Sequence, residues 1–475
     1  MVVGDFTQKV DTLVIGAGPG GYVAAIRAAQ LGQEVTLVEK DHLGGVCLNW
    51  GCIPSKAMIE VSGLKQRIAR AADMGLMTGE VTVDLAKLHH WKDDVVLRLR
   101  KGIEGLLSKN GVDVVHGNAS FTDPGHILVD TREGLQRFEF KNVVIATGSH
   151  PIQLPGVPFD GRVIIDSSDA LSLAEVPKRM VVIGAGSVGI ELGTVYRKLG
   201  ADVTILENQT ALLMMLEPEV SRILEKSLKK IGIDVLLGSE LKSVQVKNDR
   251  AELHYVQNGA AKILEADKVL VAVGRRPNTA TLGLGKLGLT TDDRGFIPVN
   301  SRLETGVKGV YAIGDAVAGL MLAHRASHMG KIAAEAISNR LAEFDNLAIP
   351  GVIFSDPEIA TVGMTQADAE NQGYTVKAGA FPFRALGRAM TIGETEGLTK
   401  VVSDGQTGTV LGVHIIGPHA SDLIAEGALA VESASHVDDL MLTIHAHPTL
   451  TEGVGEAAEA VENKAIHIFN SPMKQ

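Results

Sequence analysis

The sequence predicts an α/β protein with two doubly wound domains, followed by a separate domain of the α+β class. Three observations support this prediction. The first two are two copies of the same pattern: an apolar strand, a glycine-rich turn, a helix and a second strand that ends in an acid. The third is a change of pattern at about Ile349, after which antiparallel strands are followed by helices. One such turn is weak evidence, whereas two turns with the same spacing are strong evidence.

The first unit lies between residues 12 and 39. Its expected elements are, in order, the strand Thr12–Ile15, the turn Gly16-Ala17-Gly18-Pro19-Gly20-Gly21, the helix Tyr22–Leu31 and the strand Val35–Val38. The glycines allow a tight turn and a close approach of the backbone to a pyrophosphate, and the helix N-terminus favours the phosphate charge. Glu39 closes the unit, where its carboxylate can accept hydrogen bonds from ribose hydroxyls. The unit therefore predicts a dinucleotide site.

The second unit repeats the first between residues 180 and 207. Its expected elements are the strand Met180–Ile183, the turn Gly184-Ala185-Gly186-Ser187-Val188-Gly189, the helix Ile190–Leu199 and the strand Val203–Leu206. Glu207 follows its first glycine at the same distance as Glu39 does in the first unit. A 2′-phosphate would meet the charge of Glu207, and the residues after it, Asn208 and Gln209, supply no arginine. The second site is therefore expected to take NAD rather than NADP.

Further segments are expected around these two units. Asp84–Ser108 has helical periodicity and is expected on the surface of the first domain, and the Pro-rich stretch Pro151–Pro158 indicates a linker. The Glu-rich segment Glu452–Glu462 is expected to be a solvated helix face. Three similar apolar segments are expected to be buried strands: Val143–Gly148, Val269–Gly274 and Val310–Asp315.

The two cysteines of the chain, Cys47 and Cys52, lie directly after the first unit in GGVCLNWGCIPSK. In a cytosolic protein, a close pair beside a dinucleotide motif indicates a redox-active site rather than a structural one. Two sulfurs do not complete a zinc site, which usually takes four ligands, so no metal is expected. Lys56, one helical turn past Cys52, is either a solvated lysine or a cation placed beside a thiolate or a flavin.

A candidate acid–base pair lies near the end of the chain, in HAHPTLTE. His447 has Glu452 within reach, and a carboxylate fixes the tautomer of a histidine and raises its basicity. The bond between His447 and Pro448 could be cis, which would fix the direction of the ring. His445 is expected to be structural.

Composition excludes several other classes. The 475 residues suggest about three or four domains, and the net charge of −11 and pI near 5.8 argue against a nucleic-acid partner. No segment is long and apolar enough to span a membrane. The first ten residues carry Asp5 and Lys9 and have no apolar signal core, so a cytoplasmic location is expected.

The segments GGVCLNWGCIPSK and IHAHPTLTE resemble the catalytic segments of the pyridine nucleotide–disulfide oxidoreductases. Three further motifs match in order and spacing: VGRRPN at Val273–Asn278, AIGD at Ala312–Asp315 and LAH at Leu322–His324. The resemblance covers essentially the full length and points to the branch that oxidises dihydrolipoamide in 2-oxo acid dehydrogenase complexes.

The resemblance implies two Rossmann-like dinucleotide-binding domains with a central domain and a C-terminal α+β dimerisation domain. The implied boundaries are 1–152 for the FAD-binding domain, 153–276 for the NAD-binding domain, 277–348 for the central domain that completes the FAD site, and 349–475 for the interface domain. The resemblance also implies a homodimer in which His447 reaches the disulfide of the partner subunit.

Roles follow residue by residue from the same resemblance. The implied catalytic residues are Cys47, Cys52, His447 and Glu452. FAD contacts are implied for Gly16, Gly18, Gly21, Glu39, Lys56, Gly148, Asp315 and Ala323. NAD contacts are implied for Gly184, Gly186, Gly189, Glu191, Glu207, Gly274 and Arg275. Glu191 would also pair with Lys56 beside the flavin.

The implied reaction is the oxidation of protein-bound dihydrolipoamide, with FAD and NAD as cofactors. The substrate would attack the disulfide at Cys47, His447 oriented by Glu452 would take the thiol proton, and Cys52 would face the flavin. The implied partner is the lipoyl-bearing acyltransferase core of a 2-oxo acid dehydrogenase complex, and the sequence leaves open which complex this is.

Two other readings remain open on the sequence. The nearest is an NAD(P)H-dependent reductase of another disulfide, for which arginines would be expected after Glu207. The other is a flavin-bearing subunit whose main task is docking on an acyltransferase core. The intact cysteine pair and the His447–Glu452 pair argue against docking as the sole role.

Overall fold

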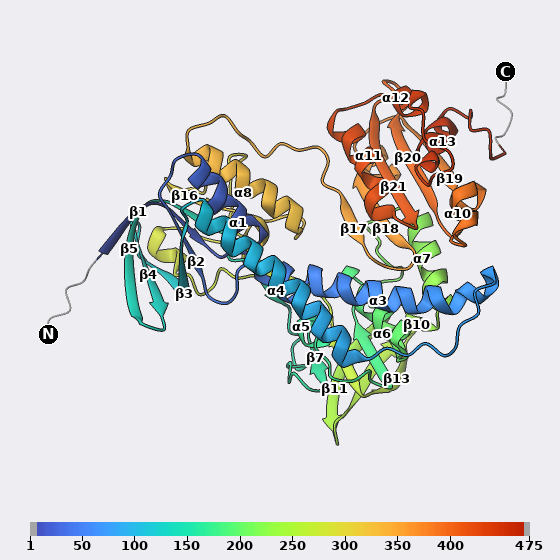
Figure 1. The fold of residues 1–475 in the computed structure, drawn as a ribbon, viewed down its shortest axis with the longest axis horizontal. Helices are drawn as coiled ribbons and strands as arrows, with labels where there is room; N and C mark the ends of the chain where they lie inside the picture. The colour runs from blue at the N-terminus through green and yellow to red at the C-terminus, as the bar shows by residue number, and fades with distance from the viewer. Residues whose placement is uncertain (1–6, 470–475) are drawn as a thin grey trace.

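The structure is a computed structural model that describes residues 7–469. Figure 1 shows three parts: a first domain at the left, a second domain in green below, and a C-terminal domain in orange and red at the upper right. The expected absence of a signal sequence rests on the first ten residues, of which residues 1–6 lie outside the described range. No helix among residues 7–469 combines the length and the hydropathy that a bilayer crossing requires.

The first domain is built on a six-stranded sheet. Its strands are β1 (Thr7–Ile15), β2 (Val35–Glu39), β3 (Asp113–Asp123), β4 (His126–Thr131), β5 (Gly134–Ile145) and β16 (Val310–Ala312). β1 pairs in parallel with β2 and β5, and β16 adds a further parallel strand beside β5. β3, β4 and β5 form an antiparallel extension. The carboxyl ends of the parallel strands therefore meet at one edge, the usual ligand edge of such sheets.

Helices from distant parts of the chain cover this sheet. They are α1 (Pro19–Gln30), α4 (Leu85–Lys109) and α8 (Ala323–Ile337). α8 lies beside α1 (Figure 1), and Arg27 of α1 forms an ion pair with Glu335 of α8 at 2.7 Å. The close approach depends on glycine, because a Cβ on Gly330 would lie 2.4 Å from the carbonyl oxygen of Gly20. Apolar residues between 282 and 337 share one core with β1 and β5, so the segment 277–348 packs as part of the first domain.

Three predicted strands end earlier than the sequence pattern indicated. β5, β14 (Lys268–Val271) and β16 all stop a few residues before the predicted boundaries at Gly148, Gly274 and Asp315, so those boundaries were wrong. Gly148, Gly274 and Gly314 have φ angles of 69°, 116° and 63°, a backbone conformation outside the β region. The chain therefore turns away at the carboxyl edge of each strand.

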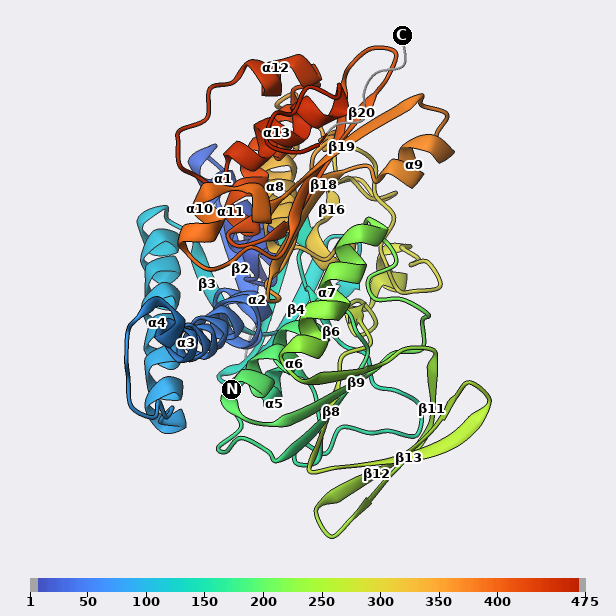
Figure 2. The same cartoon turned by 90° about the vertical axis from the view of Figure 1, so that its right-hand side faces the viewer.

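The second domain contains a parallel sheet with the strand order β10-β9-β8-β14-β7. Its strands, besides β14, are β7 (Ile164–Ile165), β8 (Arg179–Ile183), β9 (Asp202–Leu206) and β10 (Ile233–Leu236), and its helices are α5 (Ser167–Ala170), α6 (Ser187–Leu199) and α7 (Pro218–Lys230). An antiparallel sheet projects from it (Figure 2), with the strands β11 (Ser239–Lys247), β12 (Arg250–Gln257) and β13 (Ala260–Ala266). The chain leaves the first domain through β6 (Ser149–Pro151) and returns through β15 (Arg275–Pro277), and these two strands pair antiparallel.

The C-terminal domain is an antiparallel sheet covered by helices. Its strands are β17 (Gly351–Ile353), β18 (Glu358–Gly363), β19 (Val376–Pro382), β20 (Leu398–Asp404) and β21 (Val410–Gly417). Its helices are α9 (Gln366–Asn371), α10 (Gly387–Thr391), α11 (Ala420–Glu432), α12 (Val437–Leu442) and α13 (Glu452–Val461). The expectation that α13 is a solvated face was wrong in part, because Val454, Ala457, Ala458 and Val461 are buried. Gly379 allows this contact, since a Cβ there would lie 2.2 Å from the backbone nitrogen of Val461.

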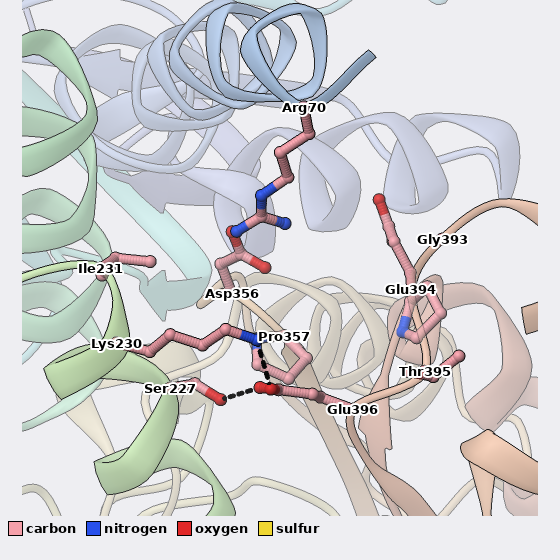
Figure 3. A pocket seen from close by; sticks show the side chains of 11 residues that line it. Arg70, Ser227, Lys230, Ile231, Asp356, Pro357, Gly393, Glu394, Thr395 and Glu396 are labelled. Atoms are coloured by element: carbon pink, nitrogen blue, oxygen red, sulfur yellow. Dashed lines mark hydrogen bonds and ion pairs between the residues drawn. The ribbon is translucent and has the colours of Figure 1, made fainter. Parts of the chain in front are cut away.

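Ion pairs connect the second domain to the C-terminal domain. Lys230 and Ser227 at the end of α7 converge on the carboxylate of Glu396 (Figure 3), at 2.5 and 3.0 Å. A cavity of about 110 Å³ opens beside this contact. Deeper in the junction, Lys400 Nζ lies 2.8 Å from Glu217 Oε2, and the two side chains are 6% and 2% exposed. The second of these pairs is therefore buried, whereas the first is accessible to water.

Replacing Lys400 by methionine should lower the free energy of unfolding by about 3–5 kcal/mol, because the buried charge of Glu217 would lose its partner. The matched change at the accessible pair, Lys230→Met, should cost less than about 1 kcal/mol. Urea unfolding monitored by circular dichroism measures both effects. Adding Glu217→Gln to Lys400→Met should restore part of the loss, and equal losses at Lys230 and Lys400 would contradict the prediction.

Candidate active site

The two glycine-rich turns have matching geometry. Gly16 and Gly184 both have a φ angle of 98°, and a Cβ on either would lie 2.4 or 2.6 Å from a backbone oxygen. Packing also leaves no room for a side chain at the third glycines, Gly21 and Gly189. A Cβ there would lie 1.8 and 2.1 Å from the carbonyl oxygen of the first glycine of each turn. The middle glycines, Gly18 and Gly186, differ: a Cβ on either would meet no atom within 4 Å. Packing does not require glycine there, whereas close approach of a ligand to the helix N-terminus does.

The two acids that close the units also occupy equivalent positions. Glu39 accepts hydrogen bonds from the backbone nitrogens of Ala17 at 2.7 Å and Asp41 at 2.8 Å. Glu207 accepts the equivalent bonds from Ala185 at 2.7 Å and Gln209 at 2.9 Å. Each carboxylate is thereby held across its glycine-rich turn, with lone pairs remaining for ribose hydroxyls.

The cysteine segment packs against the first glycine-rich turn. Cys47 lies in the short helix α2 (Gly45–Trp50), and Cys52 is the first residue of the 19-residue helix α3 (Cys52–Arg70). A Cβ on Gly45 would lie 2.6 Å from the Cα atom of Gly18, so the two segments are in direct contact. Both cysteines are free thiols in the structure, which is the dithiol form of the predicted redox pair.

The environments of the two thiols are opposite in their effect on ionisation. A hydrogen bond from Cys47 and the positive charge of Lys56 lower the pKa of Cys52 to about 7. The same hydrogen bond to Cys52, together with burial, raises the pKa of Cys47. The position of Cys52 at a helix N-terminus also favours its thiolate. Cys52 is therefore the thiol of the pair that ionises more readily.

Lys56 of the first domain is held next to the thiols by one residue from each of the other two parts of the chain. Its Nζ donates to Glu191 Oε2 at 2.8 Å, which is the predicted pair, and lies 4.4 Å from the centre of the Phe354 ring. Glu191 is 8% exposed and also accepts a hydrogen bond from the backbone nitrogen of Phe354 at 2.9 Å. Glu191 therefore connects α3 of the first domain to the C-terminal domain, and the sequence patterns gave no signal for Phe354.

The remaining predicted cofactor residues gather at the carboxyl edge of the first sheet and at the crossover. Asp315 Oδ2 accepts a hydrogen bond from Ser149 Oγ at 2.5 Å, and Arg275 donates to the same hydroxyl at 2.7 Å. Ala323 begins α8 without a side-chain cap on the residue before it, so its backbone N–H is free of the intrahelical pattern. Gly148 and Gly274 form the two turns that lead into and out of the crossover.

The predicted acid–base pair is present in the C-terminal domain. His447 Nδ1 lies 2.8 Å from Glu452 Oε1, and Glu452 Oε2 accepts a hydrogen bond from the backbone nitrogen of Thr449 at 2.8 Å. Burial raises the pKa of Glu452, but the bonds from Thr449 and His447 outweigh it, so the net pKa is lowered and the carboxylate stays ionised. The side chain of His447 is 77% exposed, so its Nε2 faces solvent. The His447–Pro448 peptide bond is cis.

Among the described residues, no hydrogen bond or ion pair joins His447 to either cysteine, and its partner is Glu452. Lys56 and Glu191 are among the charged groups that act on the thiols. His445 has a different environment from His447: its side chain is 10% exposed and its Nε2 lies 2.8 Å from Glu426 Oε1. Among residues 7–469, no group of three or more His, Cys, Asp or Glu side chains has the geometry of a metal site.

Residues 10–330 match the family described as pyridine nucleotide-disulphide oxidoreductase, and residues 349–458 match the dimerisation domain of that family. A dihydrolipoyl dehydrogenase from Geobacillus stearothermophilus is 50% identical over 469 residues, which cover 99% of this chain and 100% of the relative. One from Bacillus subtilis (strain 168) is 48% identical over 469 residues, covering 98% and 100%.

Solved structures show the same architecture. The crystal structure of LpdA from Mycobacterium tuberculosis matches with a TM-score of 0.88 and 28% sequence identity, covering 95% of this chain and 99% of that chain. The Cu(II) complex of the HOCl-induced flavoprotein disulfide reductase RclA from Escherichia coli matches with a TM-score of 0.86 and 25% identity, with the same coverage.

Proposed function

Because the chain belongs to the FAD-containing pyridine nucleotide-disulphide oxidoreductase family and acts as a dihydrolipoyl dehydrogenase, we propose how its residues divide this reaction. The observation that carries the proposal is the asymmetry of the thiol pair beside the first dinucleotide turn: Cys52 begins α3 and has a lowered pKa, whereas the pKa of Cys47 is raised. In the proposed reaction the cysteine pair receives electrons from the substrate and passes them to the flavin. One sulfur must therefore react with the substrate and the other must face the flavin.

The two glycine-rich turns are the proposed cofactor sites. The open space at Gly18, next to Gly45 of the cysteine segment, supports FAD in the first site. The matching space at Gly186, together with the acid Glu207 and the absence of arginine at the next two positions, supports NAD in the second. Bound FAD would supply the electron transfer between the dithiol and the dinucleotide, and Asp315 and Ala323 are proposed to hold it.

The proposed exchange begins at Cys47. A thiolate of dihydrolipoamide attacks the Cys47 sulfur, the Cys47–Cys52 bond breaks, and Cys52 leaves as a thiolate. The second substrate thiolate then attacks the substrate sulfur of the mixed disulfide, which forms oxidised lipoamide and releases Cys47 as a thiolate that takes up the other substrate proton. His447 takes up a proton released by the substrate, and Glu452 holds its Nδ1 so that Nε2 faces the sulfur. Lys56, held by Glu191, favours the departing Cys52 thiolate.

His447 is proposed to act on the cysteines of the partner subunit in a homodimer. The match of residues 349–458 to a dimerisation domain supports this arrangement. The segment around His447 also exposes apolar side chains that a monomer would leave in water: Leu442 is 79% exposed and Ile444 is 97% exposed. The natural substrate arm is proposed to come from a lipoyl-bearing acyltransferase core, and a cytoplasmic location stays a prediction from the sequence.

The pH dependence of thiol reactivity tests the assignment of the thiolate. In the reduced protein, alkylation of Cys52 by iodoacetamide should rise through about pH 7, because the reacting thiolate predominates above the pKa. Replacing Lys56 by methionine removes a cation that favours the thiolate, so the profile should move to higher pH. Mass spectrometry of the alkylated protein measures both profiles.

Lys65→Met is the matched control for this experiment. Lys65 lies on the same helix, but its Nζ donates to the carbonyl oxygens of Lys198 and Leu199 at 3.1 and 3.3 Å. Its removal should leave the alkylation profile of Cys52 unchanged. Overlapping profiles for the wild type and Lys56→Met would count against the proposed role of Lys56.

The direct test of the proposed function is NADH formation from dihydrolipoamide and NAD⁺ by the purified protein with FAD bound. Rapid turnover is expected with NAD⁺ and slow turnover with NADP⁺, because a 2′-phosphate would meet Glu207. Absence of turnover in protein shown to hold FAD would reject the substrate assignment. NADH- or NADPH-dependent reduction of other disulfides would then identify the alternative.

A further inference from the structure

The crossover between the first two domains is a short antiparallel ribbon. β6 carries the chain into the second domain and β15 carries it back, with Ser149 opposite Pro277 in the register. The ribbon continues at both ends, since Ile152 donates to the Gly274 carbonyl at 3.0 Å and Asn278 donates to the Gly148 carbonyl at 2.9 Å. Any relative movement of the two cofactor domains must therefore act on this ribbon.

Ser149 joins two charged residues across the ribbon. Its Oγ donates a hydrogen bond to Asp315 Oδ2 at 2.5 Å and accepts one from Arg275 Nε at 2.7 Å. Its carbonyl oxygen accepts a second bond from Arg275 Nη2 at 2.6 Å. Ser149 is 3% exposed, so water does not compete for these bonds. One buried hydroxyl thus connects a carboxylate at the edge of the first sheet to a guanidinium at the entrance of the second domain.

Among the described residues, the guanidinium of Arg275 donates hydrogen bonds from one of its edges only. Nε and Nη2 form its side-on edge, and both hydrogen bonds go to Ser149. Within residues 7–469, no hydrogen bond from Nη1 and no ion pair of Arg275 with a carboxylate within 4.0 Å is present. Partial burial lowers the pKa of Arg275, and the nearby charges of Asp315 and Asp166 act against that effect. A charged group in this setting is stabilised mainly by its hydrogen bonds and by whatever meets its free edge.

We infer that Ser149 is a positioning residue for the dinucleotide: its hydroxyl and carbonyl hold Arg275 by the side-on edge and leave the end-on edge for an oxygen of NAD. This inference rests on the proposed function, which places NAD in the second site. The bond to Asp315 fixes the direction of the Ser149 hydroxyl, because an oxygen that accepts from Arg275 must direct its own proton elsewhere. Ser149 thereby fixes the position of Arg275 with respect to Asp315, the residue proposed to hold FAD.

The test compares Ser149→Ala and Ser149→Thr with the wild type, all with FAD bound. Loss of the hydroxyl should raise the KM for NAD⁺ about ten- to hundredfold, the usual range for a hydrogen bond to a charged group. The kcat and the FAD content should stay unchanged, because the interaction concerns binding of the dinucleotide rather than the thiol exchange. Ser149→Thr keeps the hydroxyl and should restore the wild-type KM. Calorimetry of NAD⁺ binding to the same FAD-bound proteins should show the same loss of affinity in Ser149→Ala.

A double variant separates positioning from general damage. If Ser149 acts through Arg275, adding Ser149→Ala to Arg275→Gln should cost no further affinity for NAD⁺. The exposed Ser172 serves as the control, and Ser172→Ala should behave as the wild type.

Three outcomes would overturn the inference: an unchanged KM in Ser149→Ala, full additivity with Arg275→Gln, or loss of FAD from Ser149→Ala. A wild-type protein that holds FAD but shows no saturation with NAD⁺ would reject the proposed function and this inference with it. Normal saturation in the wild type with an unchanged KM in Ser149→Ala would reject the role of Ser149 alone.

Discussion

Replacing Cys52 by serine should abolish dihydrolipoamide–NAD⁺ turnover while the protein retains FAD. A serine hydroxyl does not form a disulfide with Cys47, and it is not ionised at the pH at which the Cys52 thiolate forms. Cofactor retention is expected because the first glycine-rich turn, Glu39 and Asp315 do not depend on the Cys52 sulfur. The measurements are NADH formation by absorbance and FAD content by the flavin spectrum. Turnover like that of the wild type would reject the redox role of the pair.

Cys47→Ser is the matched variant, and it distinguishes the two sulfurs. It should also lose turnover, but its remaining thiol, Cys52, should still react with iodoacetamide near neutral pH, helped by Lys56. In Cys52→Ser, the half-buried Cys47 should react only at higher pH, because burial raises its pKa. The same alkylation profile in both variants would contradict the proposed division of roles.

Replacing His447 by glutamine should lower dihydrolipoamide–NAD⁺ turnover by about 10²–10⁴-fold, the usual contribution of general acid–base catalysis. Glutamine keeps a polar side chain of similar reach but does not take up the proton of the substrate thiol. The expected loss therefore reports proton transfer rather than packing, since His447 is 77% exposed. The measurement is kcat for dihydrolipoamide as a function of pH in protein that holds FAD.

His445→Gln is the control for this change. His445 is two residues away and also lies 2.8 Å from a glutamate, but it is largely buried and packs beside Gly455. Its replacement should lower the melting temperature more than the turnover. Equal loss of kcat in the two variants, or no loss in His447→Gln, would contradict the catalytic role of His447.

Local segments of the sequence were enough to predict much of the fold and of the candidate site. The glycine-rich turns and their acids lie within single βαβ units, so their spacing along the chain sets their spacing in space. The same holds for Cys47, which lies in a short helix, and Cys52, which begins the next helix. It also holds for His447 and Glu452, whose side chains meet at 2.8 Å because Glu452 begins the helix that follows the His447 loop. Family membership and the dihydrolipoyl dehydrogenase activity follow from the same segments and were confirmed by full-length relatives.

The predicted ends of β5, β14 and β16 were wrong for a local reason that the sequence pattern does not express. Apolar residues continue to the edge of each sheet, but Gly148, Gly274 and Gly314 adopt positive φ angles and turn the chain away. A run of apolar residues indicates that the segment is buried, but it does not indicate where the strand ends. The chain can stay buried after its backbone has left the strand conformation. The half-buried face of α13 was missed because it depends on contact with Gly379 of β19.

The sequence by itself determined the two dinucleotide units, the redox pair and the acid–base pair, because each is made by residues close together along the chain. Only the tertiary structure decided which charges meet across domains. Ser149 is separated from Arg275 by 126 residues and from Asp315 by 166, and no pattern indicated that these three meet. The pair of Lys56 and Glu191, 135 residues apart, was predicted only from the family resemblance. Such contacts depend on how whole domains pack, and no periodicity or spacing along the chain encodes the meeting of two side chains so far apart.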